Sequence, residues 1–304
     1  MGIRYFLRGR EGHFGLASNE RVNSGLVGIV SVKLIVTSSE DNASMNIRAR
    51  LLEKESWAED GEFDSHPVLS HGEFRMVQVD RIHLDEDFID DRFEKASRSR
   101  PDVVIFASRH RAESRIPTLT VHAVGNYSSA DFGGRPSTLS WAHPGFMTSA
   151  LRILAVKAQG MGFNVSFETT HHGPILGSPV FYIEIGSYEE LWGREDAAEA
   201  IAASILAIRD DGYPKVLGVG GGHYAPRFTD IALGRKVSIG HMAANYALDA
   251  LNDDLILQMS EKSGGARMVY FHKKSMPKQK YRELRERFSS QGIKEISSDD
   301  LEPL

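Results

Sequence analysis

The chain has 304 residues, of which 41% are hydrophobic and 25% are charged, as is typical of a globular protein with a sizeable core. It contains no cysteine. This excludes disulfides and a thiolate nucleophile, and any metal must be bound by histidine, aspartate or glutamate. No apolar run is long enough to cross a bilayer, and the first fifteen residues have no apolar signal-peptide core. We therefore expect a cytoplasmic protein that does not bind membranes.

The net charge of −5 argues against a general nucleic-acid binder, and we expect no binding to DNA. The charge is nevertheless unevenly distributed. Residues 262–287 contain nine Lys or Arg and two Glu, and residues 98–115 contain five Arg and two acidic residues. These patches could bind a phosphate backbone. The alternative for the C-terminal patch is a solvated helix face, because 277–290 has an amphipathic pattern.

Predicted strands and helices alternate along the chain, which indicates an α/β fold with a largely parallel or mixed sheet. We expect a single domain over 1–304, with an N-terminal elaboration (1–100), a motif-bearing core (101–251) and a basic C-terminal segment (252–304). The predicted strands are 25–37, 103–107, 118–125, 164–172, 180–186 and 215–220. The predicted helices are 44–57, 146–160, 188–210, 241–251 and 277–290, and an acidic surface segment covers 80–94.

Polar residues gather near the ends of four of these strands. Ligands of open α/β sheets bind outside the carboxyl ends of the strands, so we expect one site assembled from four loops. The residues concerned are His110, His172, Glu184 and the run Gly220, Gly221, Gly222 and His223.

Side-chain alternation distinguishes two adjacent histidines in the 164–172 strand. Glu168 and His172 share a polar face, whereas His171 continues an apolar face. We therefore expect His172 to enter the site, and His171 is either a hydrogen-bonded core residue or a second site residue. Gly173 and the following proline could end the strand early and free both rings.

Two further polar residues lie inside predicted strands. A carboxylate such as Glu184, among apolar neighbours, is costly unless it is paired or bound to a cation. A structural ion pair with an arginine is the alternative. His122 lies in mid-strand, where a satisfied core histidine is the more common case and a functional role the alternative.

The glycine run that precedes His223 follows a strand directly, so its backbone amides could hold an anion, with Arg227 as a partner. His241 is expected in the first turn of a helix, where Asn245 and Asp249 would form one polar stripe with it. Such a position keeps the imidazole neutral, as ligation or base action requires. A helix-capping region with a solvated stripe is the alternative.

Six long motifs lie between residues 108 and 249. They are SRHRAES (108–114), TVHAVGNY (120–127), ETTHHGP (168–174), YIEIGS (182–187), GGGHYAPRFTD (220–230) and GHMAANYALD (240–249). These motifs resemble the archaeal and plant family of D-aminoacyl-tRNA deacylases. The resemblance implies a zinc-dependent metalloenzyme that hydrolyses the ester between a D-amino acid and tRNA. It also implies a three-layer α/β sandwich similar to peptidyl-tRNA hydrolases and nucleoside phosphorylases.

Direct attack by water on the activated ester is expected, because the chain has neither a cysteine nor a Gly-x-Ser-x-Gly elbow. We expect a monomer with aminoacyl-tRNA as its partner. The zinc ligands are assigned to His172, His223 and Glu184, and the catalytic candidates are His110, Glu113 and His241. The substrate-binding candidates are Gly220, Gly221, Gly222, Arg227, Lys273 and Lys274.

Two other functions remain open from the sequence. One is a metal-free hydrolase of peptidyl-tRNA in which His241, Asn245 and Asp249 perform the acid-base chemistry. The other is a non-catalytic tRNA-binding module with structural histidines. Metal analysis and a deacylation assay separate these functions from the deacylase.

Overall fold

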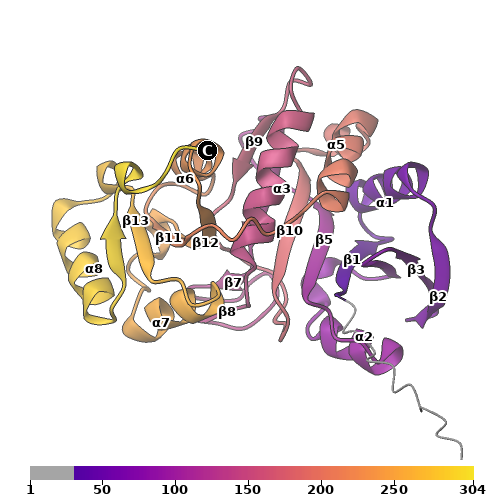
Figure 1. Ribbon diagram of the computed structural model, residues 1–304, viewed down its shortest axis with the longest axis horizontal. Coiled ribbons are helices and arrows are strands. Elements are labelled where there is room, and N and C mark those ends of the chain that lie inside the picture. Colours follow the sequence, from indigo (N-terminus) through magenta and orange to yellow (C-terminus); the bar gives the residue numbers. More distant parts are fainter. Residues whose placement is uncertain (1–30) are drawn as a thin grey trace, which may run out of the picture. The chain divides into compact units, whose positions relative to one another are not determined.

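The structure is a computed structural model that describes residues 31–304 (Figure 1). Its larger sheet has eight strands in the order β2-β3-β4-β1-β5-β10-β6-β9. The four strands β4, β1, β5 and β10 are parallel, β6 is antiparallel to β10, and β9 is parallel to β6. The sheet is therefore mixed, which confirms the expected α/β class. Its strands are β1 (Lys33–Ser38), β2 (Ala58–Phe63), β3 (His66–His71), β4 (Phe74–Val79), β5 (Val103–Arg109), β6 (Thr118–Ala123), β9 (Asn164–Phe167) and β10 (Val180–Gly186).

A second, smaller sheet contains four parallel strands in the order β12-β11-β13-β14. Its strands all lie beyond residue 214, in the part of the chain drawn in orange and yellow in Figure 1. A third sheet is a short pair, β7 (Gly125–Asn126) with β8 (Thr138–Leu139). The strands of the smaller sheet are β11 (Lys215–Val219), β12 (Ser238–Ala243), β13 (Met268–Phe271) and β14 (Lys294–Ile296).

Helices cover both faces of the larger sheet. Helices α1, α3 and α5 bury the apolar side chains of one face, and α2 packs against the other. Helices α7 and α8 bury one face of the smaller sheet. The helices are α1 (Asn42–Lys54), α2 (Ile89–Ser97), α3 (Pro144–Lys157), α4 (Glu189–Trp192), α5 (Glu195–Leu206), α6 (Pro226–Gly234), α7 (Asp253–Lys262) and α8 (Lys278–Ser290). Within residues 31–304, no helix combines the length and the apolar character that a membrane crossing requires.

Most predicted elements are present, but three differ. The predicted helix 241–251 is wrong, because 238–243 forms strand β12, which pairs with β11, and only a single 3-10 turn follows at Asn245–Ala247. The predicted strand 164–172 ends at Phe167, and the predicted helix 188–210 is divided into α4 and α5. The first part of the predicted strand 25–37 lies outside the described residues. Residues 31–304 form one compact unit, and the finer subdivision of the domain stays a prediction.

Candidate active site

The site lies on the face of the larger sheet opposite α1, α3 and α5. Strands β5, β10 and β6 are adjacent, so side chains at matching positions form rows across this face. The first row is aromatic, with ring centroids 4.8 and 5.0 Å apart, and consists of Phe106, Tyr182 and His122. The second row is polar and consists of Ser108, Glu184 and Thr120.

The expected meeting of four carboxyl strand ends is wrong for β9. This strand is parallel to β6 and therefore runs opposite to β5 and β10. Its carboxyl end consequently points in the direction opposite to the carboxyl ends of β5 and β10. Its polar residues reach the site because the chain continues beside β6 with an irregular backbone after Phe167.

A one-residue bulge after β9 explains why the His171 side chain enters the site. Phe167 pairs with Val121, but His171 pairs with Val124, so this segment gains one residue relative to β6. An inserted residue moves the following side chains to the other face. His171 consequently lies beside His122, with ring centroids 4.2 Å apart. The alternation of a regular strand, on which the preference for His172 rested, therefore does not hold here, and His171 enters the site as well.

The residue after His171 also departs from a strand conformation. His172 has a φ of +31°, which is uncommon for a residue with a side chain, and Gly173 has a φ of +89°. A Cβ at Gly173 would lie 2.8 Å from Val124, so glycine is required at this close approach. The sharp turn brings the His172 ring to 5.0 Å from that of His122.

Glu168 lies at the centre of the histidines and is fully buried. Its carboxylate oxygens are 3.2 Å from Nδ1 of His110, 3.3 Å from Nε2 of His171 and 3.4 Å from Nε2 of His223. The second carboxylate, Glu184, is 3.5 Å from Nε2 of His122. His122 and Glu184 lie on β6 and β10, and the other residues lie on the segments that follow β5, β9 and β11.

Three histidines are oriented by a bond on the side of the ring that faces away from the carboxylates. Nδ1 of His122 is 3.1 Å from the carbonyl oxygen of Ala123, and Nδ1 of His171 is 2.8 Å from that of Thr169. A carbonyl only accepts, so both rings carry their proton on Nδ1 and present the lone pair of Nε2 to the site. Nε2 of His110 is 3.0 Å from the hydroxyl of Tyr224, which leaves Nδ1 to face the carboxylates.

The pKa values of the two carboxyl groups are shifted in opposite directions. Burial would raise the pKa of Glu168, but the approach of His223 and the charges of neighbouring histidines lower it below its usual value. Burial and the negative charges of Glu168 and Asp41 raise the pKa of Glu184 well above its usual range. Burial also lowers the pKa of His110, and that of His122 to about 3. The shifts favour the charged form of Glu168 and the neutral forms of His110 and His122, and a metal site requires a carboxylate anion and neutral imidazoles of this kind.

Unpaired polar atoms support a cation at this place. Both oxygens of Glu168, Nε2 of His122 and Nδ1 of His172 are buried and lack a hydrogen-bond partner within residues 31–304. Such atoms are costly to bury unless a cation or water binds them. Two ligand atoms of one tetrahedral Zn²⁺ lie about 3.3 Å apart, and the imidazole–carboxylate distances around Glu168 match this spacing. Three groups have ligand atoms within 4.8 Å of one another: His122 with His171 and His172, His110 with Glu168 and His223, and His122 with Glu168 and Glu184.

Comparison with known proteins shows the family of the chain. Residues 97–296, which include the whole site, match the family model described as D-aminoacyl-tRNA deacylase. The chain belongs to the D-aminoacyl-tRNA deacylase family. The resemblance inferred from the motifs is thereby confirmed, as is the expected class of enzyme, a hydrolase.

Several members of the deacylase family are similar over most of the chain. A D-aminoacyl-tRNA deacylase of Methanosarcina mazei is 36% identical over 276 residues, which cover 88% of this chain and 92% of that protein. One of Methanococcoides burtonii is 38% identical over 88% of this chain, but this chain spans only 57% of its length. A crystal structure described as the conserved protein of unknown function AF0625 has a TM-score of 0.81 and 30% identity, covering 89% of this chain and 96% of that one.

The three zinc ligands assigned from the sequence all lie in the site of this deacylase family member, but in different groups. Each of the three groups contains one of these ligands: His172, His223 or Glu184. No group among the described residues therefore contains all three. Glu168 was assigned no role, although its place on the polar face with His172 was a signal for it. For His122 and His171 the sequence leaves a core role and a site role open, and strand register places both rings in the site.

Two catalytic candidates lie elsewhere. His241 is a fully buried residue of β12, and its ring nitrogens contact the Thr170 hydroxyl at 3.1 Å and the Ser140 carbonyl at 2.9 Å. It therefore forms no helical stripe with Asn245, and its ring has no nitrogen left for a substrate. Glu113 is exposed and lines a separate pocket with Arg111, whereas His110 lies in the site as expected.

The glycine run is held mainly by protein contacts. The amide of Gly220 donates to the carbonyl of Ala243 at 2.8 Å. The amide of Gly221, at a φ of +93°, donates to Oγ of Ser275 at 2.8 Å and to Oδ1 of Asn245 at 3.2 Å. Only the amide of Gly222 lacks an acceptor within the described residues. The run therefore positions His223, and the predicted anion cradle is reduced to a single amide.

Proposed function

We propose that the chain hydrolyses the ester bond of D-aminoacyl-tRNA and releases the free D-amino acid and tRNA. The observation that supports this is the carboxylate of Glu168, buried among histidine nitrogens at ligand spacing, in a chain of the deacylase family. The ester is already activated, so a positioned water, a proton acceptor and stabilisation of the developing oxyanion are sufficient. The same proposal holds that the chain acts in the cytoplasm and as a monomer.

We further propose that the metal is Zn²⁺ and that Glu168 is its principal carboxylate ligand. The donor set contains only imidazole and carboxylate, which suits zinc in a chain without cysteine. Glu168 and His223 are proposed to hold one ion, the adjoining histidines can hold a second ion, and His110 is left for proton transfer. When bound, zinc supplies Lewis-acid polarisation of a carbonyl and activation of water.

The proton transfer proposed for His110 now has Tyr224 as its partner, in place of Glu113. The His110 ring bridges the Tyr224 hydroxyl and the two carboxylates, so it connects the buried site with the more exposed loop after β11. His223 is the most open of these rings, with 36% of its side chain exposed, and it marks the side from which the ester can enter.

Turnover of D- and L-aminoacyl-tRNA, with and without a chelator, tests this function. We expect D-specific deacylation that is lost on metal removal and restored by about one or two equivalents of Zn²⁺. A sample shown by elemental analysis to be free of metal, yet fully active, would contradict the zinc proposal. Absence of turnover in the zinc-loaded protein would contradict the deacylase proposal.

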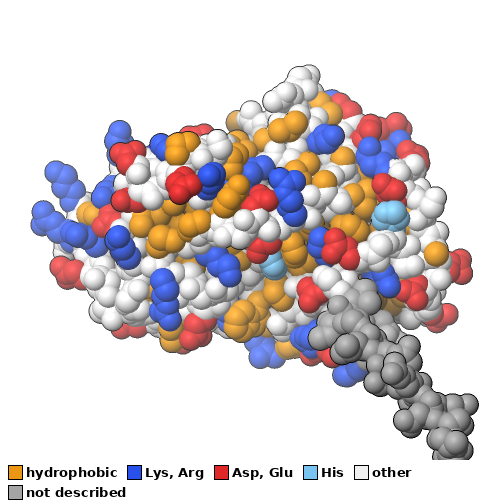
Figure 2. All heavy atoms as spheres, viewed as in Figure 1, with side chains coloured by type: hydrophobic (Ala, Val, Ile, Leu, Met, Phe, Trp, Pro, Cys, Tyr) orange, Lys and Arg blue, Asp and Glu red, His pale blue; other side chains and the backbone are white. Residues whose placement is uncertain are grey.

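The tRNA backbone is proposed to bind the smaller sheet. Lys and Arg side chains gather at the end of the molecule where Figure 1 draws α8 (Figure 2). The predicted residues Arg227, Lys273 and Lys274 line one pocket of about 510 Å³. No carboxylate lies within ion-pair distance of Arg227 or Lys274 in residues 31–304, so their charge is free to meet a phosphate.

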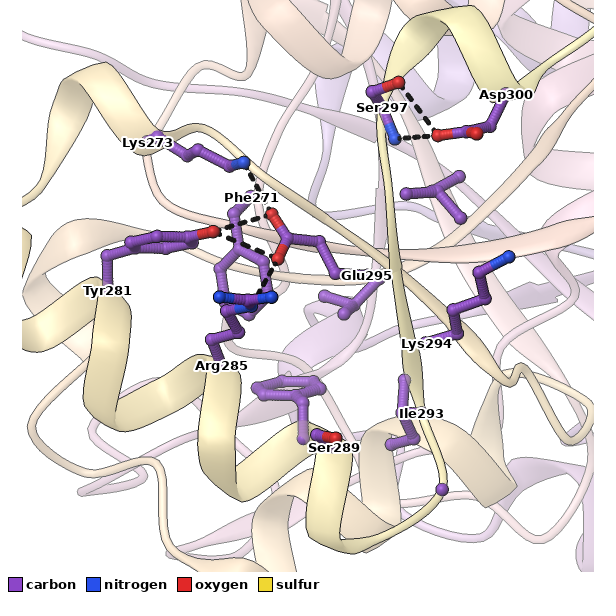
Figure 3. Close-up of a pocket in the computed structure, with 14 residues that line it drawn as sticks. Phe271, Lys273, Tyr281, Arg285, Ser289, Ile293, Lys294, Glu295, Ser297 and Asp300 are labelled. Atoms are coloured by element: carbon purple, nitrogen blue, oxygen red, sulfur yellow. Dashed lines mark hydrogen bonds and ion pairs between the residues drawn. The ribbon is translucent and has the colours of Figure 1, made fainter.

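Lys273 faces a neighbouring pocket of about 790 Å³ and is already neutralised there (Figure 3). The carboxylate of Glu295, on β14, lies 2.7 Å from Nζ of Lys273 and 3.0 Å from Nε of Arg285. The hydroxyl of Tyr281 also donates to it, at 2.9 Å. Of the three predicted residues, Lys274 and Arg227 should therefore contribute more to phosphate binding than Lys273.

Replacement of Lys274 by alanine is expected to raise KM about threefold to tenfold and to leave kcat unchanged. The dependence of log KM on log salt concentration should become shallower by about 0.7 to 0.9, since one phosphate contact is lost. Lys280→Ala is the matched control, because Lys280 is paired with Asp249 and Glu283 at 3.0 and 3.1 Å. A fall in kcat with unchanged KM would place Lys274 in the chemistry instead.

A further inference from the structure

An exposed aromatic ring stands beside the candidate active site and has no role in the proposed chemistry. Tyr246 lies in the 3-10 turn Asn245–Ala247 and is 65% exposed. Within residues 31–304, only Phe132 is as exposed among the large hydrophobic residues. A soluble protein exposes an aromatic ring next to a polar site at a cost, which suggests that a ligand covers it.

The hydroxyl end of this ring is attached to the active-site segment. The Tyr246 hydroxyl lies 3.4 Å from Oγ1 of Thr169, the residue that follows Glu168. Thr169 in turn donates to the carbonyl of His223, through its amide at 2.9 Å and its hydroxyl at 3.3 Å. The ring of Tyr246 therefore stands next to the most open histidine of the site.

The backbone of the turn is fixed as well. The amide of Asn245 donates to the carbonyl of Gly221 at 2.8 Å, and the amide of Gly221 donates back to Oδ1 of Asn245. Nδ2 of Asn245 donates to the carbonyl of Ser275 at 2.7 Å. The ring is thus held at both ends while its face is exposed, so little conformational entropy is lost when a flat ligand covers it.

We propose that Tyr246 is the platform on which the terminal adenine base of the aminoacylated tRNA stacks. This inference rests on the proposed function, in which the ester is carried by the ribose of the terminal adenosine. The base is attached to the ribose that bears the scissile bond, so it must lie close to the mouth of the site. Stacking of the base on an aromatic ring does not depend on which amino acid the ester carries.

The test combines protein variants with two substrates. One is an acceptor-stem RNA that carries a D-amino acid on its terminal adenosine, and the other is the same RNA with a terminal ribose that lacks the base. For the adenosine substrate, Tyr246→Ala should raise KM about 5-fold to 150-fold, the range that corresponds to the loss of one stacked base, with kcat within about threefold. For the abasic substrate, wild type and Tyr246→Ala should be equal. Tyr246→Phe, which keeps the ring, should resemble the wild type with both substrates.

Phe132→Ala is the matched control, because Phe132 is equally exposed and its carbonyl, which the substitution keeps, accepts from the amide of Gly173. A base-dependent loss in this variant would move the platform to Phe132 and overturn the proposal. An equal loss of activity with both substrates in Tyr246→Ala would also overturn it, since the ring would then contact the amino acid or support the site. Tyr246→Leu keeps an apolar side chain but has no aromatic ring, so it should show the same base-dependent rise in KM as Tyr246→Ala. Failure of the wild type to deacylate the adenosine substrate contradicts the proposed function instead.

Discussion

Glu168→Gln is expected to reduce kcat/KM by about 1,000-fold or more and to leave the protein folded. The carboxylate is the one anion that the three imidazoles of His110, His171 and His223 share. Glutamine keeps the shape of the side chain but removes the charge that binds a cation. Steady-state turnover of D-aminoacyl-tRNA measures the loss, and elemental analysis should show less bound zinc.

Stability distinguishes this role from a structural one. The histidines around Glu168 lower the pKa of its carboxyl group and so offset the cost of burying its charge, although both oxygens lack a hydrogen-bond partner in the described part of the chain. The thermal midpoint of metal-free Glu168→Gln should therefore lie within about 5 °C of that of the metal-free wild type. Glu113→Gln is the control, since Glu113 is exposed in another pocket, and it should retain kcat/KM within about threefold. A large loss of stability in Glu168→Gln, with normal turnover of the folded fraction, would contradict the assignment.

His171→Ala and His172→Ala are each expected to lower kcat/KM by about 100-fold or more. Both rings form one possible metal-binding group with His122. The bulge after Phe167 brings His171 onto the same face as His122. The measurement is kcat/KM together with bound zinc per chain, and both quantities should fall in both variants.

His241→Ala provides the comparison for these two variants. His241 is bonded through both ring nitrogens inside the protein, so its loss should reduce stability by about 1–3 kcal/mol, with a smaller effect on turnover by the folded protein. If His171→Ala behaved like His241→Ala, with a lowered thermal midpoint and intact turnover, His171 would be a core histidine after all. The bulge would then not serve the site.

The sequence by itself determined the family, the class of fold and the places where several site residues lie. Strand 103–107 is apolar on both faces, a local pattern that is typical of a strand in a sheet covered on both sides. Alternation within strand 180–186 separated Glu184 from its apolar neighbours, and the structure places it on the opposite face from Ile183. These conclusions depend on single strands, for which the local sequence is sufficient.

Only the tertiary structure decided which of the candidate residues meet. One inserted residue beside β6 moves His171 into the site, and pairing with β11 makes 238–243 a strand and encloses His241. Glu168 becomes the central carboxylate because the loop that carries His223 lies against it. Strand pairing, register and bulges arise between segments far apart in the chain, so the local periodicity of one segment cannot specify them.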